Sequence, residues 1–156
     1  MAFYNRMRAV EYARRWSFSR NPAYYNFDAI GGDCTNFISQ CLFAGSGKMN
    51  YRKTFGWYYT DLNRRAPAWT GVRELHQFLT TNRGAGPYGS ETTLQQLEPG
   101  DIIQLDFGSG FAHSLLVISN GDDVRVATHT DDSFDRPLDS YYYVTARYIH
   151  IDGVRI

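Results

Sequence analysis

The sequence predicts an α+β domain in which N-terminal helices pack on a C-terminal antiparallel β-sheet. In the first half, apolar residues recur at helical spacing, whereas short β-rich runs separated by turns begin at about residue 102. Helices followed by strands is the order of an α+β fold. The chain has 156 residues and no internal repeat, so we expect a single domain over residues 1–156.

The first predicted helix covers about residues 3–17 and is amphipathic. Charged residues separate its apolar positions, which are Met7, Val10, Tyr12, Ala13 and Trp16. The helix is expected to end before Asn21 and Pro22. Turn formers and aromatic residues then predict an ordered loop that reaches Gly31 and Gly32.

A second helix of about three turns is predicted to begin at Cys34. Asp33 is its expected N-cap, and Gly45 and Gly47 supply its stop. One apolar face of this helix consists of Phe37, Ile38, Cys41 and Leu42. The cap places Cys34 in the first turn and leaves Cys41 on the apolar face, where a free cysteine packs as a small hydrophobic residue.

The remaining elements follow from the same patterns. Thr70 is expected to cap a helix that ends before Asn82, and residues 84–93 are expected to form a loop. The predicted strands are residues 102–105, 113–118, 124–129, 142–144 and 146–151.

Composition excludes several classes of function. Lys and Arg together number 16, and Asp and Glu together also number 16. No long run of residues with the same charge occurs, so nucleic acid is not an expected partner. No run of 18 apolar residues predicts a membrane span, and the N-terminus lacks the apolar core of a signal peptide. The chain therefore reads as cytoplasmic, or as extracellular or cell-wall if a leader has been removed. The sequence makes no prediction of oligomeric state.

The cysteine spacing predicts two free thiols. Cys34 and Cys41 are seven residues apart, which is roughly 10.5 Å along a helix and too far for a disulfide. No spacing of Cys and His typical of a metal site occurs. We expect neither a metal nor another cofactor.

Cys34 is the candidate nucleophile. A helix N-terminus stabilises a thiolate, so its position predicts a lowered pKa, and the N–H groups of the first turn can also receive an oxyanion. The alternative is that Cys34 merely packs the start of the helix.

A cysteine nucleophile needs a base, and His113 is the best placed of the four histidines. It begins a strand after a glycine-rich turn, and the hairpin that follows puts residue 113 opposite about residue 130, near His129. His129 or Asp131 could then orient the base. His76 and His150 are expected to be surface or core residues.

Four segments carry a resemblance to a known family. They are Gly32-Asp33-Cys34-Thr35-Asn36-Phe37-Ile38-Ser39-Gln40-Cys41-Leu42, Pro99-Gly100-Asp101-Ile102-Ile103, Ala112-His113-Ser114 and Thr128-His129-Thr130-Asp131. The chain resembles the putative amidase domain family of bacteria, which is similar to the papain-like cysteine peptidases and amidases, including the cysteine/histidine-dependent domains that cut peptidoglycan. The resemblance implies a papain-like fold.

The resemblance also implies roles for individual residues. Cys34 would be the nucleophile, His113 the general base and acid, and His129 the third polar residue, which Asp131 could replace. The backbone N–H of Cys34 would line the oxyanion hole, and Asp33 or Tyr25 would assist at the substrate.

The aromatic residues of the middle segment have two interpretations. Trp57 and Trp69 either stiffen the core or form a cleft wall on which a glycan or muramyl peptide stacks. In the second case they join Asp33 and Tyr25 as substrate-binding residues.

The sequence thus predicts a cysteine amidohydrolase or peptidase. The resemblance implies a peptide or peptidoglycan-derived substrate. The alternatives are an acyltransferase with the same two residues, a catalytically inactive module that binds glycan or peptide, and a structural protein with no reactive thiol.

Overall fold

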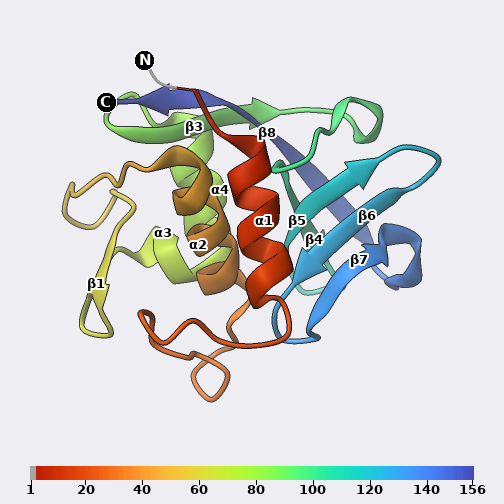
Figure 1. Cartoon of the computed structure of the whole chain (residues 1–156), viewed down its shortest axis with the longest axis horizontal. Helices are drawn as coiled ribbons and strands as arrows, with labels where there is room; N and C mark the ends of the chain where they lie inside the picture. The colour runs from red at the N-terminus through yellow and green to blue at the C-terminus, as the bar shows by residue number, and fades with distance from the viewer. Residues whose placement is uncertain (1–2) are drawn as a thin grey trace.

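The computed structural model describes residues 3–156 and shows helices on one side of an antiparallel sheet (Figure 1). The helices are α1 (Arg6–Trp16), α2 (Cys34–Ser46), α3 (Pro67–Thr70) and α4 (Val72–Thr81), with 3₁₀ turns η1 (Leu94–Gln96) and η2 (Leu138–Ser140). The strands are β1 (Tyr59–Asp61), β2 (Arg64–Arg65), β3 (Gly86–Glu91), β4 (Ile102–Asp106), β5 (Phe111–Asn120), β6 (Val124–Thr128), β7 (Ser133–Pro137) and β8 (Thr145–Arg155).

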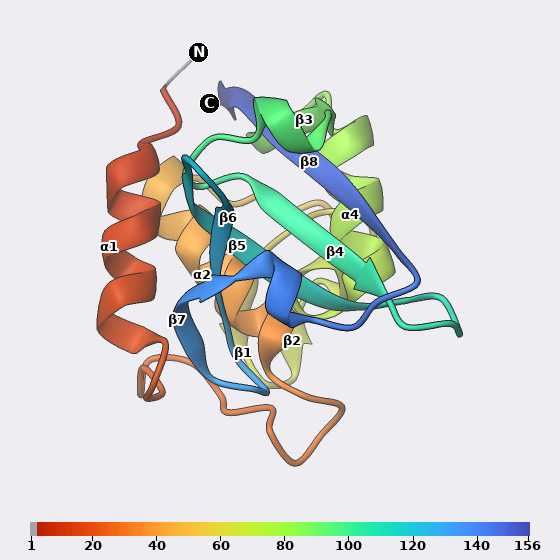
Figure 2. The same ribbon diagram turned by 90° about the vertical axis from the view of Figure 1, so that its right-hand side faces the viewer.

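The main sheet has six antiparallel strands in the order β3-β8-β4-β5-β6-β7, and β1 and β2 form a separate hairpin. The view turned by 90° shows the sheet in front of α2, with α1 and α4 on either side (Figure 2). The predicted α+β class and the order of helices and sheet are confirmed.

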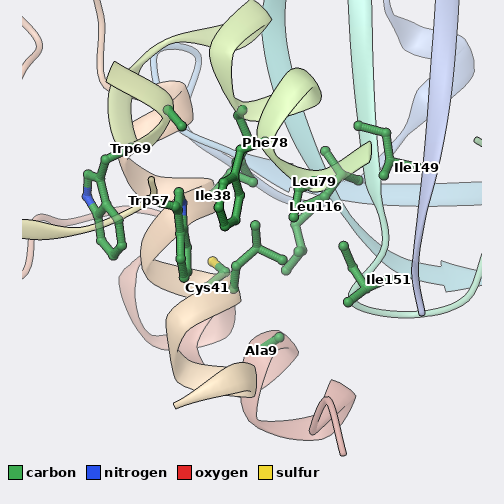
Figure 3. Packing of buried hydrophobic residues seen from close by; sticks show 14 of the residues in the cluster. Ala9, Ile38, Cys41, Trp57, Trp69, Phe78, Leu79, Leu116, Ile149 and Ile151 are labelled. Carbon is green, nitrogen blue, oxygen red and sulfur yellow. The ribbon is translucent and has the colours of Figure 1, made fainter. Parts of the chain in front are cut away.

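Alternation along the strands divides the core into two parts. Leu116 and Ile149 face the helices, where they pack with the largest cluster (Figure 3). Their neighbours Leu115 and Val117 belong to a smaller cluster on the other face, which is covered by η1, η2, Tyr141, Tyr143 and Tyr148. The sheet is therefore buried on both sides near its centre.

Close packing of α1 on α2 fixes the helix that carries the cysteines. An added Cβ at Gly45 would lie 2.5 Å from the Tyr4 ring, so only glycine allows this approach. Asn5 N–H donates to the Gly45 carbonyl at 2.8 Å and also caps α1 through its side chain. The stop predicted for α2 is confirmed, since Gly47 has the left-handed φ of 66°.

Several local predictions were wrong. Residues 86–91, expected within a loop, form β3 because they pair with β8 far along the chain, and β7 was not foreseen. Residues 142–144, expected as a strand, are irregular and lie beside the sheet. Thr70 ends α3 instead of capping α4, whose N-cap is Gly71.

Candidate active site

Cys34 is the first residue of α2 and is 8% exposed. Its sulfur lies 3.7 Å from the hydroxyl of Thr35, and the backbone N–H groups of Thr35 and Ser114 face it. Burial raises the pKa of the Cys34 thiol, and these hydrogen bonds oppose the rise without cancelling it. The predicted lowering of this pKa was therefore wrong, because burial outweighs the favourable helix terminus.

Asp33 occupies the N-cap position of α2 but does not cap the helix with its side chain. One carboxylate oxygen instead accepts from Phe27 N–H at 2.8 Å and from the Asn36 amide at 2.9 Å. The N–H groups of the first turn are thus left without the expected side-chain acceptor. An anion that forms beside Cys34 could accept hydrogen bonds from these N–H groups.

His113 lies near the start of β5 and is 7% exposed. Its ring lies 6.3 Å from that of Phe107 and 6.1 Å from that of Tyr141, measured between centroids. Burial lowers the pKa of His113 to about 4, with a smaller opposing effect of Asp131 and a reinforcing effect of Arg136. The imidazole is therefore neutral at pH 7, which is the form that can accept a proton.

The contacts of Thr128 favour one tautomer of His113. Its hydroxyl donates to the Ser114 carbonyl at 2.8 Å and lies 3.4 Å from Nε2 of His113. Because the Thr128 hydroxyl proton is donated to the Ser114 carbonyl, Oγ1 of Thr128 can only accept from Nε2–H of His113. That tautomer leaves the lone pair on Nδ1 of His113.

The structure brings Cys34 and His113 to one corner of the domain without joining them. The Cys34 sulfur contacts the backbone of Ser114, which directly follows His113 in β5. Within residues 3–156, no hydrogen bond connects this sulfur to a ring nitrogen of His113. Contacts between catalytic groups are often long before substrate binds, so the separation does not exclude the pair.

His129 does not contact His113 through a hydrogen bond in the described residues. Its Nδ1 lies 2.6 Å from Oδ2 of Asp33, and its Nε2 lies 2.7 Å from the Trp16 carbonyl. Its ring stacks on Phe37 at a centroid distance of 3.9 Å. The structure places this candidate orienting residue against Asp33 instead.

Asp131, the other candidate orienting residue, points toward solvent and binds Arg136. It acts on His113 through charge alone among the contacts of residues 3–156, since it favours the protonated imidazole. The hairpin register was nevertheless predicted well. Leu116 pairs with Ala127, and continuing this register puts residue 113 opposite residue 130.

Three of the four candidate substrate-binding residues are buried. Trp57 and Trp69 are fully buried in the core, where their rings lie 4.8 Å apart (Figure 3). Asp33 is 1% exposed, so neither it nor the two tryptophans forms a cleft wall. The cleft interpretation of Trp57 and Trp69 was wrong, and Tyr25, which is 39% exposed, is the one candidate of the four that a substrate could touch.

Polar residues beneath the site were missed. Ser114 is fully buried and its hydroxyl lies 3.0 Å from that of Thr35, while Gln104 donates to it at 3.2 Å. Their sequence signal was the presence of polar side chains at helix-facing positions of otherwise apolar strands. Buried polar side chains that hydrogen-bond to one another fix the relative positions of the elements that carry them.

The other two histidines lie elsewhere. His76 bonds Glu91 near the surface, and His150 bonds the buried Asp101 at 2.9 Å. Across residues 3–156, no three His, Cys, Asp or Glu side chains are grouped so that they could hold a metal ion. No helix in that range has both the length and the apolar character needed to cross a bilayer.

Comparisons with known proteins point to amide chemistry. The family model described as "Putative amidase domain" matches residues 3–151. The chain is similar to "Uncharacterized protein YhbB" of Bacillus subtilis (strain 168), with 35% identity over 120 residues. That alignment covers 74% of this chain and 37% of the relative, so the chain spans little more than a third of it. No solved structure matches, and the papain-like fold therefore stays a prediction.

Proposed function

The chain belongs to the putative amidase domain family, and we propose that it hydrolyses an amide bond with Cys34 as nucleophile and His113 as base. Family membership itself indicates amide hydrolysis. The observation that carries the cysteine mechanism is the placement of Cys34 at a helix start that Asp33 leaves uncapped, with its sulfur against the residue that follows a neutral His113.

The proposed reaction starts from a neutral thiol and a neutral imidazole. Nδ1 of His113 takes the thiol proton as the Cys34 sulfur attacks the amide carbonyl, and the first-turn N–H groups of α2 stabilise the oxyanion. The imidazolium then gives its proton to the leaving amine, and a thioester remains. Water, deprotonated by His113, hydrolyses the thioester and releases a carboxylic acid, after which the thiol is restored.

We further propose that the substrate is a bacterial peptide or a peptidoglycan-derived peptide. The support is the resemblance of the segments around Cys34 and His113 to the putative amidase domain family, which is similar to enzymes that cut peptidoglycan. The exposed Tyr25 is the candidate contact for this substrate.

The test is hydrolysis of a panel of peptides and muropeptides, followed by mass spectrometry. We expect the parent and Cys41→Ala to release amine and acid, and Cys34→Ala and His113→Gln to release neither. An acyl group trapped on Cys34 after acid quenching would support the thioester. Full turnover by Cys34→Ala would overturn the cysteine mechanism and leave amide hydrolysis standing.

Two further outcomes separate the alternatives. Acyl transfer to an added amine in preference to water would replace the hydrolase with an acyltransferase. Binding of muropeptide with no reaction in any variant would replace both with a binding module, and it would contradict the proposal.

A further inference from the structure

Asp33 directly precedes Cys34 and is bound on both carboxylate oxygens. Oδ1 accepts from Phe27 N–H and from the Asn36 side chain. Oδ2 lies 2.6 Å from Nδ1 of His129 and 3.7 Å from Nε of Arg20. Burial raises the pKa of Asp33, but the hydrogen bonds from His129, Asn36 and Phe27 more than offset it, so the pKa lies below its ordinary value. The group is therefore a carboxylate.

Both ring nitrogens of His129 face hydrogen-bond acceptors. Its Nε2 faces the Trp16 carbonyl at 2.7 Å, and a carbonyl can only accept. Its Nδ1 faces the carboxylate of Asp33, which also accepts. Hydrogen bonds to two acceptors require a proton on each ring nitrogen of His129, as in an imidazolium paired with the Asp33 carboxylate. Neither ring nitrogen of His129 is therefore available to hydrogen-bond with His113.

This pair connects three parts of the chain. Trp16 ends α1, Asp33 precedes α2, and His129 follows β6. Both members of the pair are 1% exposed, and the imidazole ring stacks on Phe37 inside α2. A buried ion pair with all its hydrogen-bonding groups engaged holds one geometry.

Arg20 links the pair to two further carboxylates. It donates to Asp28 at 3.1 and 3.2 Å and to Asp132 at 3.0 Å through each of two nitrogens, in addition to its approach to Asp33. It thereby ties the loop before Cys34 to the loop after His129. The carboxylates of Asp28, Asp33 and Asp132 thus all lie around Arg20.

We propose that Asp33 and a doubly protonated His129 form a positioning pair, which fixes the first turn of α2 and with it the Cys34 sulfur and the N–H groups for the oxyanion. The pair acts through the backbone of Asp33, and His129 does not orient His113. This inference rests on the proposed function of Cys34, and its first test does not.

The first test is the ¹⁵N chemical shift of the histidine rings in ¹⁵N-labelled protein at pH 7. We expect both nitrogens of His129 to show the imidazolium signature in the parent and the neutral form in Asp33→Asn. His113 should be neutral in both proteins. A singly protonated His129 in the folded parent would overturn the inference, whatever the function of Cys34.

The second test is a double-mutant cycle with Asp33→Asn and His129→Gln on the hydrolysis of the peptide found above. We expect each variant to lower kcat about 10- to 100-fold with KM unchanged, and the double variant to be no slower than either. His76→Gln is the matched control and should keep full activity. Multiplied losses, or unchanged kcat in Asp33→Asn, would overturn the positioning role.

Circular dichroism and urea unfolding show whether each variant remains folded. Where His129→Gln fails to fold, Asp33→Glu keeps the charge pair with a displaced carboxylate. We then expect an imidazolium at position 129 together with a lowered kcat. Loss of all hydrolysis in Cys34→Ala separates this result from failure of the proposed function.

Discussion

Oγ1 of Thr128 lies 3.4 Å from Nε2 of His113 while its hydroxyl donates to the Ser114 carbonyl at 2.8 Å. If the hydroxyl accepts from Nε2–H, Nδ1 is left to act as the base in the proposed mechanism. In the proposed mechanism a third group orients the base, and Thr128 contacts His113 at the place where His129 or Asp131 was expected. This relationship distinguishes the geometry of the site from the arrangement that the resemblance implies.

Replacing Thr128 with valine should lower kcat because the acceptor for Nε2–H is lost and the other tautomer becomes populated. A neutral hydrogen bond contributes about 1 kcal/mol, so we expect a loss of about fivefold, with KM unchanged. Steady-state kinetics on the peptide identified above measures it. Thr128→Ser keeps the hydroxyl and should keep the rate; equal losses in both variants would argue for packing instead of hydrogen bonding.

His113 should make the protein less stable in acid. Its pKa of about 4 in the folded protein lies below the ordinary 6.5, so the unfolded chain binds the extra proton between these values. The penalty is absent above pH 6.5, grows as pH falls, and is complete below about pH 4. At pH 4.5 it amounts to about 2–3 kcal/mol.

Urea unfolding of the parent and of His113→Gln at pH 7 and pH 4.5 checks this penalty. We expect the parent to lose more unfolding free energy between the two pH values than the variant does. His76→Gln, which removes a histidine near the surface, is the control and should follow the parent. The same loss in the parent and in His113→Gln would mean that the imidazole does not carry the penalty.

The sequence predicted the helix that carries Cys34 and the hairpin that carries His113 because both follow from local periodicity and turns. It missed β3 since the stability of that strand comes from pairing with β8, about 60 residues away. The glycines and proline of Gly86–Glu91 read locally as a loop.

The contacts of the candidate site could be predicted only in part, for a similar reason. Cys34 and His113 have signatures in their own segments, whereas the partner of His129 depends on where α1 ends and on how Asp33 turns. The hairpin register correctly predicts that the backbone of His129 lies near position 113. The side chain of His129, however, points toward Asp33 and contacts it. Burial, which sets the direction of the Cys34 pKa, is a property of the whole fold.

Trp69 should contribute to stability and not to substrate binding. Its indole N–H donates at 2.9 Å to Oδ1 of Asn36, whose amide in turn binds Asp33. Trp69→Phe leaves that buried oxygen without a donor, and we expect a loss of about 1–3 kcal/mol in unfolding free energy. Peptide KM should not change, because the ring is fully buried.

Tyr25→Ala is the comparison for Trp69→Phe. Tyr25 is 39% exposed, so its replacement should change stability little and raise KM if the substrate contacts its ring. Thermal unfolding and steady-state kinetics on the same samples separate the two effects. A raised KM in Trp69→Phe with unchanged stability would restore the cleft interpretation of the tryptophan.

The two cysteines should differ in their reaction with iodoacetamide, which attacks only the thiolate. Burial raises the pKa of both thiols above the ordinary 9.0, far more for the fully buried Cys41. Raising the pKa removes thiolate at neutral pH, so Cys34 should label slowly at pH 6 and increasingly fast above pH 9. Cys41 should stay unlabelled until the protein unfolds, and it reports on folding in the same sample. Mass spectrometry of the digested protein assigns the label to each site.

Rapid labelling of Cys34 at pH 6 that disappears in His113→Gln would show a thiolate–imidazolium pair before substrate binds. It would replace the general-base step with attack by a preformed thiolate.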